Sequence, residues 1–560
     1  MERELCLTRL QFKKENNIAT YLDEWCLYGV KDISSYDVAC VKYDDNVSEK
    51  TQYYYEQLLD ILTNYMNGYH KQKHSKRYWR ILLGTWLNHF VDITYDRYCH
   101  IKKALSMHQN EAYTVKILNR EDYVIPFDTA AFRELLFSDF YVFQISSDII
   151  KSFSMKTVLA DVSGKQIKLL YKMALSSLRE QYKKKVEAYR FYYKEQLYLL
   201  KSFQVLSPQN VENHTFDFDE IVVEYPDHFK SGVIHNDVER PVLMITNDDY
   251  DEYIYLVSKF IVSYIPSIYI ENYIEMSQIV NNCIGETIHC FINEDWHFNE
   301  FLKFTAAQTE MMQGKIISVN PGGVCDVTRF GREEKHEKDL ADCYWSREGG
   351  KKNSCRIPIE YKQNQKEKKN TLLFLSAGFY RPYTCSFDDF PVTFEEIESY
   401  FSNQLRFLES LSTERKNMLI YRFHPYRHSK EDILRMNQFD FHKSFDGQIE
   451  EYIEEAELII VDHITTAWFS MLQYGKKFIL FWEKRLYPVT DEFDKLLYEM
   501  KKVGLFFSDG KTAAIYLNNI EDYTVWWEEE ERKKVRERFV SYMVDLRKQR
   551  LCINDFIDYL

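Results

Sequence analysis

The sequence lacks the patterns by which several classes of protein are recognised. Its 11 cysteines form no Cys-x-x-Cys pair, so no zinc or disulfide framework is indicated and reduced thiols of a cytoplasmic protein are expected. Residues 1–7 lack the charged and then apolar layout of a signal peptide. No apolar run approaches the ~20 residues of a membrane span, so any membrane contact is expected to be peripheral. Walker, Gly-x-Ser-x-Gly, Cys–His protease and protein-kinase signatures are also missing.

Positive charge is in deficit as well. The chain has 72 Lys and Arg against 86 Asp and Glu, a net charge of −14, which argues against a nucleic-acid partner because such proteins show a basic face. Its hydrophobic content of 45% is that of a globular protein. A length of 560 residues predicts two to four domains.

Short apolar runs alternate with helical patterns in the second half of the chain. This alternation is typical of βα units on a parallel, doubly wound sheet. The predicted strands are Leu372–Leu375, Met418–Phe423, Leu458–Val461 and Phe478–Phe481, and the predicted helices are Thr393–Ser410, Gly447–Ala456 and Thr465–Tyr474.

The segment 347–370 is polar, charged and Gly-containing, and is the best linker candidate. We therefore expect an acceptor-side Rossmann-like domain over residues 1–350, a nucleotide-donor domain over 365–545 and a tail over 546–560, with a ligand cleft between the two domains. A helical insertion is predicted over about 129–285, within which Ile167–Phe203 is helical in pattern and contains no Pro or Gly. Its basic and aromatic block Tyr182–Lys194 is either a solvated helix face or a contact to an anionic membrane.

Polar residues follow three predicted strands of the second half. Asp462, Thr465 and Thr466 stand at a helix start, where hydroxyls and unpaired N–H groups suit a phosphate; ordinary capping is the alternative. His424, next to Arg422, follows another strand and can donate to a phosphate oxygen; a loop histidine without a role is the alternative. The small residues Ser376 to Gly378 either admit a ligand close to the backbone or form a tight turn.

The first half has one comparable strand end. Asn320-Pro-Gly-Gly323 follows the predicted strand Lys315–Val319, and Glu334, His336 and Glu337 come shortly afterwards. One of these three side chains is a candidate general base, and a solvated helix turn is the alternative. The spacing is not a metal signature, and we predict no metal.

Two N-terminal motifs resemble those of a known family. Leu22-Asp-Glu-Trp-Cys26 is similar to a Leu-Gly-Glu-Trp-Cys element, with Asp23 for Gly, and Tyr78–Leu87 is similar to a Tyr-Trp-x-Ile-Leu-x-Gly-Pro-Trp-Leu helix, with Thr85 for Pro. These motifs are typical of bacterial transferases encoded in surface-carbohydrate (O-antigen type) gene clusters, first noted in leptospires. The resemblance extends over about residues 4–490. The family's Gln-His pair is replaced here by Asn320 and Pro321.

The resemblance implies an α/β fold of the GT-B glycosyltransferase type, in which two Rossmann-like domains face each other across a cleft. It implies transfer of a sugar from a nucleotide donor to a cell-surface glycan or lipid-linked glycan, without cofactor or metal, in the cytoplasm or peripherally on the inner face of the membrane. The His-Pro element and the hydroxyl-rich helix start also resemble those of enzymes that use cytidine nucleotides, which favours a cytidine-based donor.

The residues expected at each side follow from the motifs and the resemblance together. Glu334 or His336 is expected to be the catalytic base. The residues expected to bind the donor are Ser376, Gly378, Arg422, His424, Thr465 and Thr466. Those expected near the acceptor are Glu24, Arg80, His89, Gly322 and Gly323. Two alternatives remain, namely a polyol-phosphate transferase with a CDP-linked donor and a non-catalytic glycan- or nucleotide-binding scaffold in polysaccharide assembly.

Overall fold

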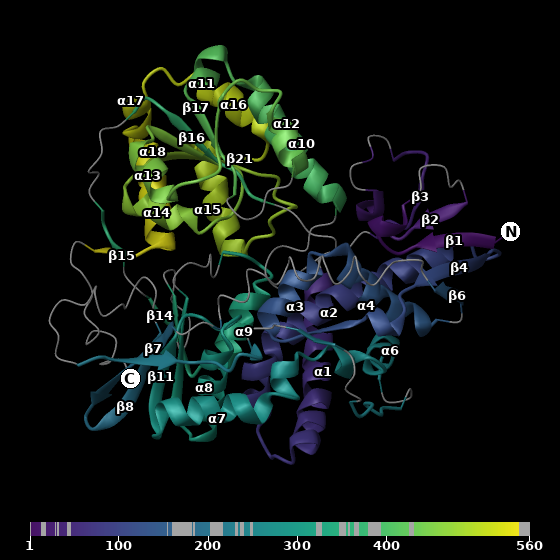
Figure 1. Cartoon of the computed structure of the whole chain (residues 1–560). Coiled ribbons are helices and arrows are strands. Elements are labelled where there is room, and N and C mark those ends of the chain that lie inside the picture. Colours follow the sequence, from purple (N-terminus) through teal and green to yellow (C-terminus); the bar gives the residue numbers. More distant parts are fainter. Residues whose placement is uncertain are drawn as a thin grey trace.

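The structure, a computed structural model, has a C-terminal lobe that stands apart from a larger N-terminal part (Figure 1). It describes residues 2–12, 18–27, 30, 33–41, 46–153, 155–159, 182, 185–201, 217–229, 233–235, 240–246, 250–320, 327–346, 354–356, 359–362, 369–378, 394–424 and 430–547. The chain is mixed α/β, with three larger sheets that are wholly or mostly parallel. The α/β class predicted from the sequence is confirmed.

The first sheet is built from the N-terminal strands and is parallel throughout, in the order β3-β2-β1-β4-β6. This order is that of a Rossmann-like half, in which the chain winds outward from a central strand in both directions. Its strands are β1 (Glu2–Cys6), β2 (Ala19–Tyr21), β3 (Asp37–Val38), β4 (Ala112–Ile117) and β6 (Lys156–Leu159).

Helix α2 (Lys76–Met107) is the central element of the N-terminal part. It begins at Ser75, whose hydroxyl caps the backbone N–H of Tyr78, and most of its side chains are buried because helices pack around it on several sides. Those helices are α1 (Val47–His70), α3 (Thr129–Leu136), α4 (Asp139–Lys151), α6 (Glu252–Ser258), α8 (Glu300–Met311) and α9 (Arg332–Leu340). The remaining elements of this part are α7 (Tyr273–Ile284), the antiparallel pair β5 (Val124–Pro126) and β10 (Val233–His235), and the short 3-10 helices η1 (Arg9–Gln11), η2 (Glu24–Leu27), η3 (Arg120–Asp122), η7 (Ile261–Tyr264) and η8 (Ser267–Tyr269).

A second sheet of seven strands completes the N-terminal part, in the order β14-β13-β12-β11-β8-β7-β9. Strands β14 to β8 are parallel, and β7 is antiparallel to both of its neighbours. The strands are β7 (Lys185–Tyr193), β8 (Gln196–Lys201), β9 (Asp219–Val223), β11 (Ile288–Asn293), β12 (Lys315–Asn320), β13 (Cys343–Ser346) and β14 (Ser354–Arg356).

One prediction in this region is wrong. The described part of Ile167–Phe203 is not helical but forms the hairpin β7–β8. The block Tyr182–Lys194 therefore supplies an inner strand of a sheet, in which Glu187, Ala188 and Phe191 are buried. It does not form the amphipathic helix that a membrane contact of the predicted kind requires.

The C-terminal lobe contains the third sheet, which is parallel throughout. Its order β18-β17-β16-β19-β20-β21 corresponds to 3-2-1-4-5-6 in chain order, the order of dinucleotide-binding folds. The predicted alternation of strands and helices is confirmed. The strands are β16 (Leu372–Leu375), β17 (Leu419–Arg422), β18 (His442–Ser444), β19 (Leu458–Val461), β20 (Lys477–Phe481) and β21 (Phe506–Phe507), and the helices are α10 (Phe394–Ser410), α11 (Thr413–Asn417), α12 (Lys430–Met436), α13 (Ile449–Glu455), α14 (Ala467–Gln473), α15 (Asp491–Lys502), α16 (Gly510–Asn518), α17 (Tyr523–Trp527) and α18 (Glu530–Met543).

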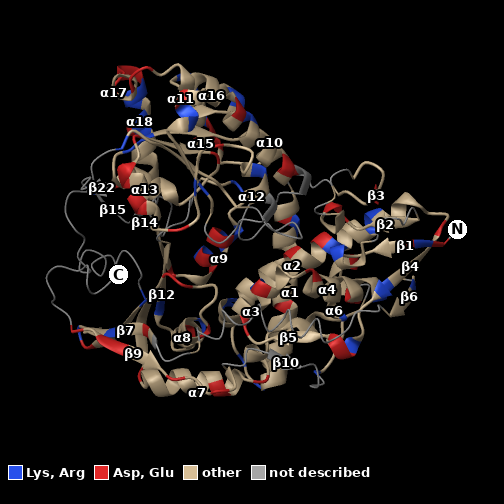
Figure 2. Cartoon of the chain, turned by 45° about the horizontal axis from the view of Figure 1, so that its top comes forward, with Lys and Arg blue, Asp and Glu red and all other residues tan. Residues whose placement is uncertain are grey.

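Backbone hydrogen bonds connect the lobe to the N-terminal part. The amide of Arg329 donates to the carbonyl of Pro488, and the amide of Thr490 donates to that of Val327, each at 3.0 Å. Residues after α18 return to the connecting segment, where β22 (Leu546–Arg547) pairs with β15 (Ile359–Glu360). Acidic and basic residues are interspersed over the helices of the lobe (Figure 2). Among the described helices, none has the length and apolar character to cross a membrane.

Candidate functional site

The carboxyl ends of β16, β17 and β19 lie side by side in the C-terminal sheet. Leu375 is in register with Arg422 on one side and with Val461 on the other, so the residues that follow these three strands share one edge. We call Ser376–Gly378, Arg422–His424 and Asp462–Thr466 together the donor-side edge. Because β16 and β19 are the strands at which the winding reverses, this edge includes the place where open α/β sheets bind ligands.

A buried hydrogen-bond network lies beneath the donor-side edge. Tyr421 Oη donates to Gln404 Oε1 at 2.8 Å and lies 2.9 Å from Ser376 Oγ. Gln404 Nε2 and Tyr400 Oη both donate to Asp462 Oδ2, at 2.8 and 2.7 Å. Burial, together with the negative charge of Asp462, raises the pKa of Tyr400 well above its ordinary value. The structure thus places Ser376 and Asp462 inside the lobe, where they fix the ends of β16 and β19.

Arg422 is also held internally. Its guanidinium donates to Ser444 Oγ at 3.1 Å and to the carbonyls of Asp446 and Gly447 at 2.6 Å each, and it lies over the ring of Tyr452. These contacts order the loop after β18. In this arrangement Arg422 stabilises the donor-side edge, because its guanidinium donates to two backbone carbonyls and to a serine hydroxyl.

Four of the residues predicted at the donor side lie nearer the solvent. Gly378, His424 and Thr465 are half-buried and Thr466 is exposed. Thr465 Oγ1 accepts a hydrogen bond from the amide of Ala467 at 3.3 Å, in the first turn of α14. The hydroxyls and the imidazole predicted to bind a phosphate therefore lie on one sheet edge, as the sequence indicated.

His463 belongs to the same edge and was missed from the sequence. Its Nδ1 lies 2.9 Å from Asp462 Oδ1, and a carboxylate at one ring nitrogen fixes the orientation of an imidazole. The sequence could have indicated His463, because it directly follows Asp462 in the motif that predicted the helix start.

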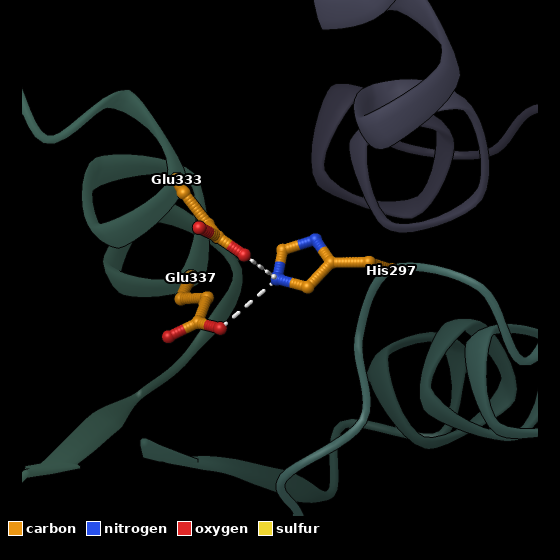
Figure 3. Close-up of side chains that lie close together, drawn as sticks. All are labelled: His297, Glu333 and Glu337. Carbon is orange, nitrogen blue, oxygen red and sulfur yellow. Dashed lines mark hydrogen bonds and ion pairs between the residues drawn. The ribbon is translucent and has the colours of Figure 1, made fainter. Parts of the chain in front are cut away.

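A second group of polar side chains lies at the carboxyl edge of β11 and β12. His297 is in the loop between β11 and α8, and Glu333 and Glu337 stand one turn apart on α9, so their side chains share a face. His297 Nε2 is 3.2 Å from Glu333 Oε1 and 3.1 Å from Glu337 Oε1 (Figure 3). We call these three residues the imidazole–carboxylate cluster.

Two further residues, both at positions that depart from the family motifs, support this cluster. Asn320, the last residue of β12, donates through Nδ2 to Glu337 Oε2 at 3.0 Å. Thr85 Oγ1 lies 3.3 Å from His297 Nδ1. His297 and Glu333 were missed as site residues, because only the fold brings the loop after β11 beside α9.

The two candidate bases lie beside the cluster on α9. His336 is only 3% exposed, and its Nε2 is 3.5 Å from Thr85 Oγ1. Burial lowers the pKa of His336 well below its ordinary value, and the positive charges of nearby side chains add to this effect, so its imidazole is neutral near pH 7. Glu334 forms an ion pair with Lys338 on the same helix.

The residues predicted near the acceptor do not form one group. Arg80 pairs with Glu56 and Asp339, at 2.7 and 3.1 Å, and His89 is buried on α2 beside the ring of Phe298. Both lie on α2, where Arg80 faces α1 and α9 and His89 faces the loop between β11 and α8. Glu24 lies elsewhere, in η2, where it accepts from Cys40 Sγ at 3.5 Å. Gly322 and Gly323 are outside the described residues.

The sequence profile of one family, described as the LIC12162 family transferase, matches residues 3–551. The chain belongs to the LIC12162 family of transferases. The resemblance noted from the N-terminal motifs is confirmed, and in this member of the LIC12162 family Thr85 and Asn320 replace motif residues within contact of the cluster.

Two further comparisons accompany the family match. No curated protein matches the chain in sequence. A solved structure of the spinosyn rhamnosyltransferase SpnG complexed with spinosyn aglycone aligns with a TM-score of 0.27 and 6% sequence identity, over 49% of this chain and 76% of that chain. A likeness of this size carries no argument about the site.

Proposed function

We propose that this LIC12162-family transferase moves a sugar from a nucleotide-activated donor to a hydroxyl of a bacterial cell-surface glycan of the O-antigen type. The observation that carries the proposal is the donor-side edge, because a 3-2-1-4-5-6 sheet presents His424, Thr465 and Thr466 where such sheets bind nucleotides. The acceptor is a glycan or lipid-linked glycan that is reached from the cytoplasmic side of the membrane.

The donor phosphates would contact His424, Thr465, Thr466 and the backbone near Gly378. Imidazole N–H and hydroxyl groups can donate hydrogen bonds to phosphate oxygens. Ser376 and Arg422 act as positioning residues in this proposal. Ser376 Oγ is hydrogen-bonded to Gln404 and Tyr421, and the guanidinium of Arg422 is hydrogen-bonded to the loop after β18. The resemblance to users of cytidine nucleotides favours a cytidine-based donor.

The acceptor would bind on the side of α9 and the edge of β12. The base predicted from sequence is Glu334 or His336. Of the two, Glu334 is nearer the surface, with its side chain 13% exposed, whereas a substrate hydroxyl reaches His336 only if α2 or α9 moves. Replacement of Glu334 by Gln should therefore lower kcat and leave KM nearly unchanged, since it removes a proton acceptor and little binding surface.

Thermal unfolding with a panel of nucleotides (CMP, CDP, UDP, GDP and dTDP) tests the donor side. A ligand at ~100 times its Kd stabilises a protein by about 2.7 kcal/mol, which a melting curve resolves. We expect a rise in Tm with cytidine nucleotides and the loss of that rise in His424→Ala. His442→Ala is the matched control, because His442 opens β18 at the opposite, amino edge of the same sheet.

The possible outcomes separate the alternatives. A Tm shift with a nucleotide of another nucleobase would support a transferase that uses a different class of donor. An equal shift in His424→Ala and His442→Ala contradicts the placement of the nucleotide. The absence of a shift with every nucleotide contradicts the proposed donor side and leaves a glycan-binding scaffold as the better account.

A further inference from the structure

We propose that the imidazole–carboxylate cluster binds one first-row divalent transition-metal ion of the Zn²⁺ or Mn²⁺ type. One imidazole nitrogen and two carboxylate oxygens form a mixed ligand set of a kind that such ions bind in proteins. The three ligand atoms all lie within 4.8 Å of one another. In Figure 3 the imidazole of His297 points from its loop toward the two carboxylates of α9.

The spacing of these atoms already approximates that around a metal. Ligands bound to tetrahedral Zn²⁺ at about 2.0–2.1 Å stand roughly 3.3–3.4 Å apart. His297 Nε2 is 3.2 Å from the nearer Glu333 oxygen and 3.1 Å from the nearer Glu337 oxygen. These two distances would have to lengthen by only about 0.1–0.3 Å to reach that spacing, and the two carboxylate oxygens lie within 4.8 Å of each other.

The surrounding residues orient the ligand atoms inward. Thr85 Oγ1 is close to the other ring nitrogen of His297, which leaves Nε2 directed at the carboxylates. Asn320 donates to Oε2 of Glu337, which leaves Oε1 directed at His297. Hydrogen bonds of this kind to the non-ligating atoms are typical of metal sites, where they fix the tautomer and the rotamer of the ligands.

Charge and exposure favour an accessible site. Two carboxylates balance a divalent cation without help from a protonated imidazole. The side chains of His297 and Glu337 are 13% and 6% exposed, whereas that of Glu333 is 44% exposed. The cluster is thus closed on the protein side and open beside Glu333, as expected where a metal keeps a position for water or a substrate oxygen.

The sequence did not indicate this set, because helix α8 and strand β12 separate His297 from Glu333 and Glu337 along the chain. The inference goes beyond the proposed function, since the binding of a cation can be measured without any donor or acceptor.

Isothermal titration of the chelator-treated, metal-free protein with Zn²⁺ and with Mn²⁺ tests the inference. We expect one site in the wild type and at least a tenfold loss of affinity in Glu333→Gln and in Glu337→Gln. Both changes keep the shape of the side chain, and Glu333→Gln alters a half-exposed residue, so it decides the matter if Glu337→Gln fails to fold. Mg²⁺ and Ca²⁺, which prefer oxygen ligands, should bind more weakly.

His228→Ala is the matched control. His228 forms a His–Glu pair like that of the cluster, with its Nε2 2.8 Å from Glu275 Oε2, but at a more exposed place. Its removal should leave the titration unchanged. No binding of either ion to the wild type, or binding to Glu333→Gln that equals binding to His228→Ala, would overturn the proposal.

Discussion

Gly84 on α2 lies directly against His336 of α9. A Cβ at this position would overlap Cε1 of His336 and lie 2.9 Å from Tyr55 Oη. Gly84→Ala should therefore displace His336 and destabilise the protein by about 1–3 kcal/mol, as overpacking of a core does. Urea unfolding measures the loss.

Gly68→Ala on α1 is the matched control for that change. A Cβ at Gly68 meets no atom within 4 Å, and alanine is the better helix former by about 1 kcal/mol. This variant should unfold at the same or a higher urea concentration than the wild type. Equal effects of the two substitutions would show that the contact between Gly84 and His336 is not tight.

Asp128 makes a pH-dependent contribution to stability. Burial, and next the charge of Glu300, raise the pKa of Asp128 to about 6, so the folded state holds the proton more tightly than the unfolded state does. Stability from this group is therefore lost as the pH rises from about 4 to about 6. Asp128→Asn, which keeps an N-cap for α3, should gain about 1–3 kcal/mol relative to the wild type over that range. Parallel urea-midpoint curves against pH would contradict the assignment.

The ends of strands β16, β17 and β19 depend on their shared network. Ser376→Ala removes a hydroxyl that contacts Gln404 and Tyr421, and the loss should cost about 1–2 kcal/mol of stability. The Tm shift caused by a nucleotide should persist in this variant. His424→Ala should instead keep the stability of the wild type and lose the Tm shift. Loss of the nucleotide effect at unchanged stability would instead place Ser376 in contact with the donor.

The elements of the C-terminal lobe could be predicted and the hairpin β7–β8 could not. In the lobe, short apolar strands buried on both faces alternate with amphipathic helices, so the local pattern and the fold agree. In the hairpin, the turn residues Lys194 and Glu195 have φ angles of +48° and +62°. Hairpin turns of that conformation usually carry Asn or Gly, and without this signal a run free of Gly and Pro was interpreted as a helix.

At the scale of the whole molecule, the sequence predicted polar residues that directly follow a strand and missed residues that only the fold brings together. The donor-side edge was accessible because each of its motifs directly follows a strand. The imidazole–carboxylate cluster was not, because it needs the loop after β11, the helix after β12 and Thr85 of α2 at one place. The burial of His336 and the ion pairs of Arg80 were hidden for the same reason.

The proposed reaction requires both parts of the chain. The donor-side edge belongs to the C-terminal lobe, and the proposed acceptor side belongs to α9 and β12 of the N-terminal part. Group transfer requires both, since holding two reactants together supplies much of the rate. The backbone contacts of residues 327–329 with residues 488–490 connect the two parts close to the start of α9.

Release of free nucleotide from nucleotide sugars, in the presence of a surface-glycan acceptor, is the decisive assay for the donor-side edge. We expect release from a cytidine-activated donor by the wild type and by His442→Ala, and a loss of at least tenfold in His424→Ala, which lacks a phosphate contact. Release from CDP-glycerol alone would assign the polyol-phosphate reaction instead. No release from any donor, or equal release by His424→Ala and His442→Ala, would contradict the account.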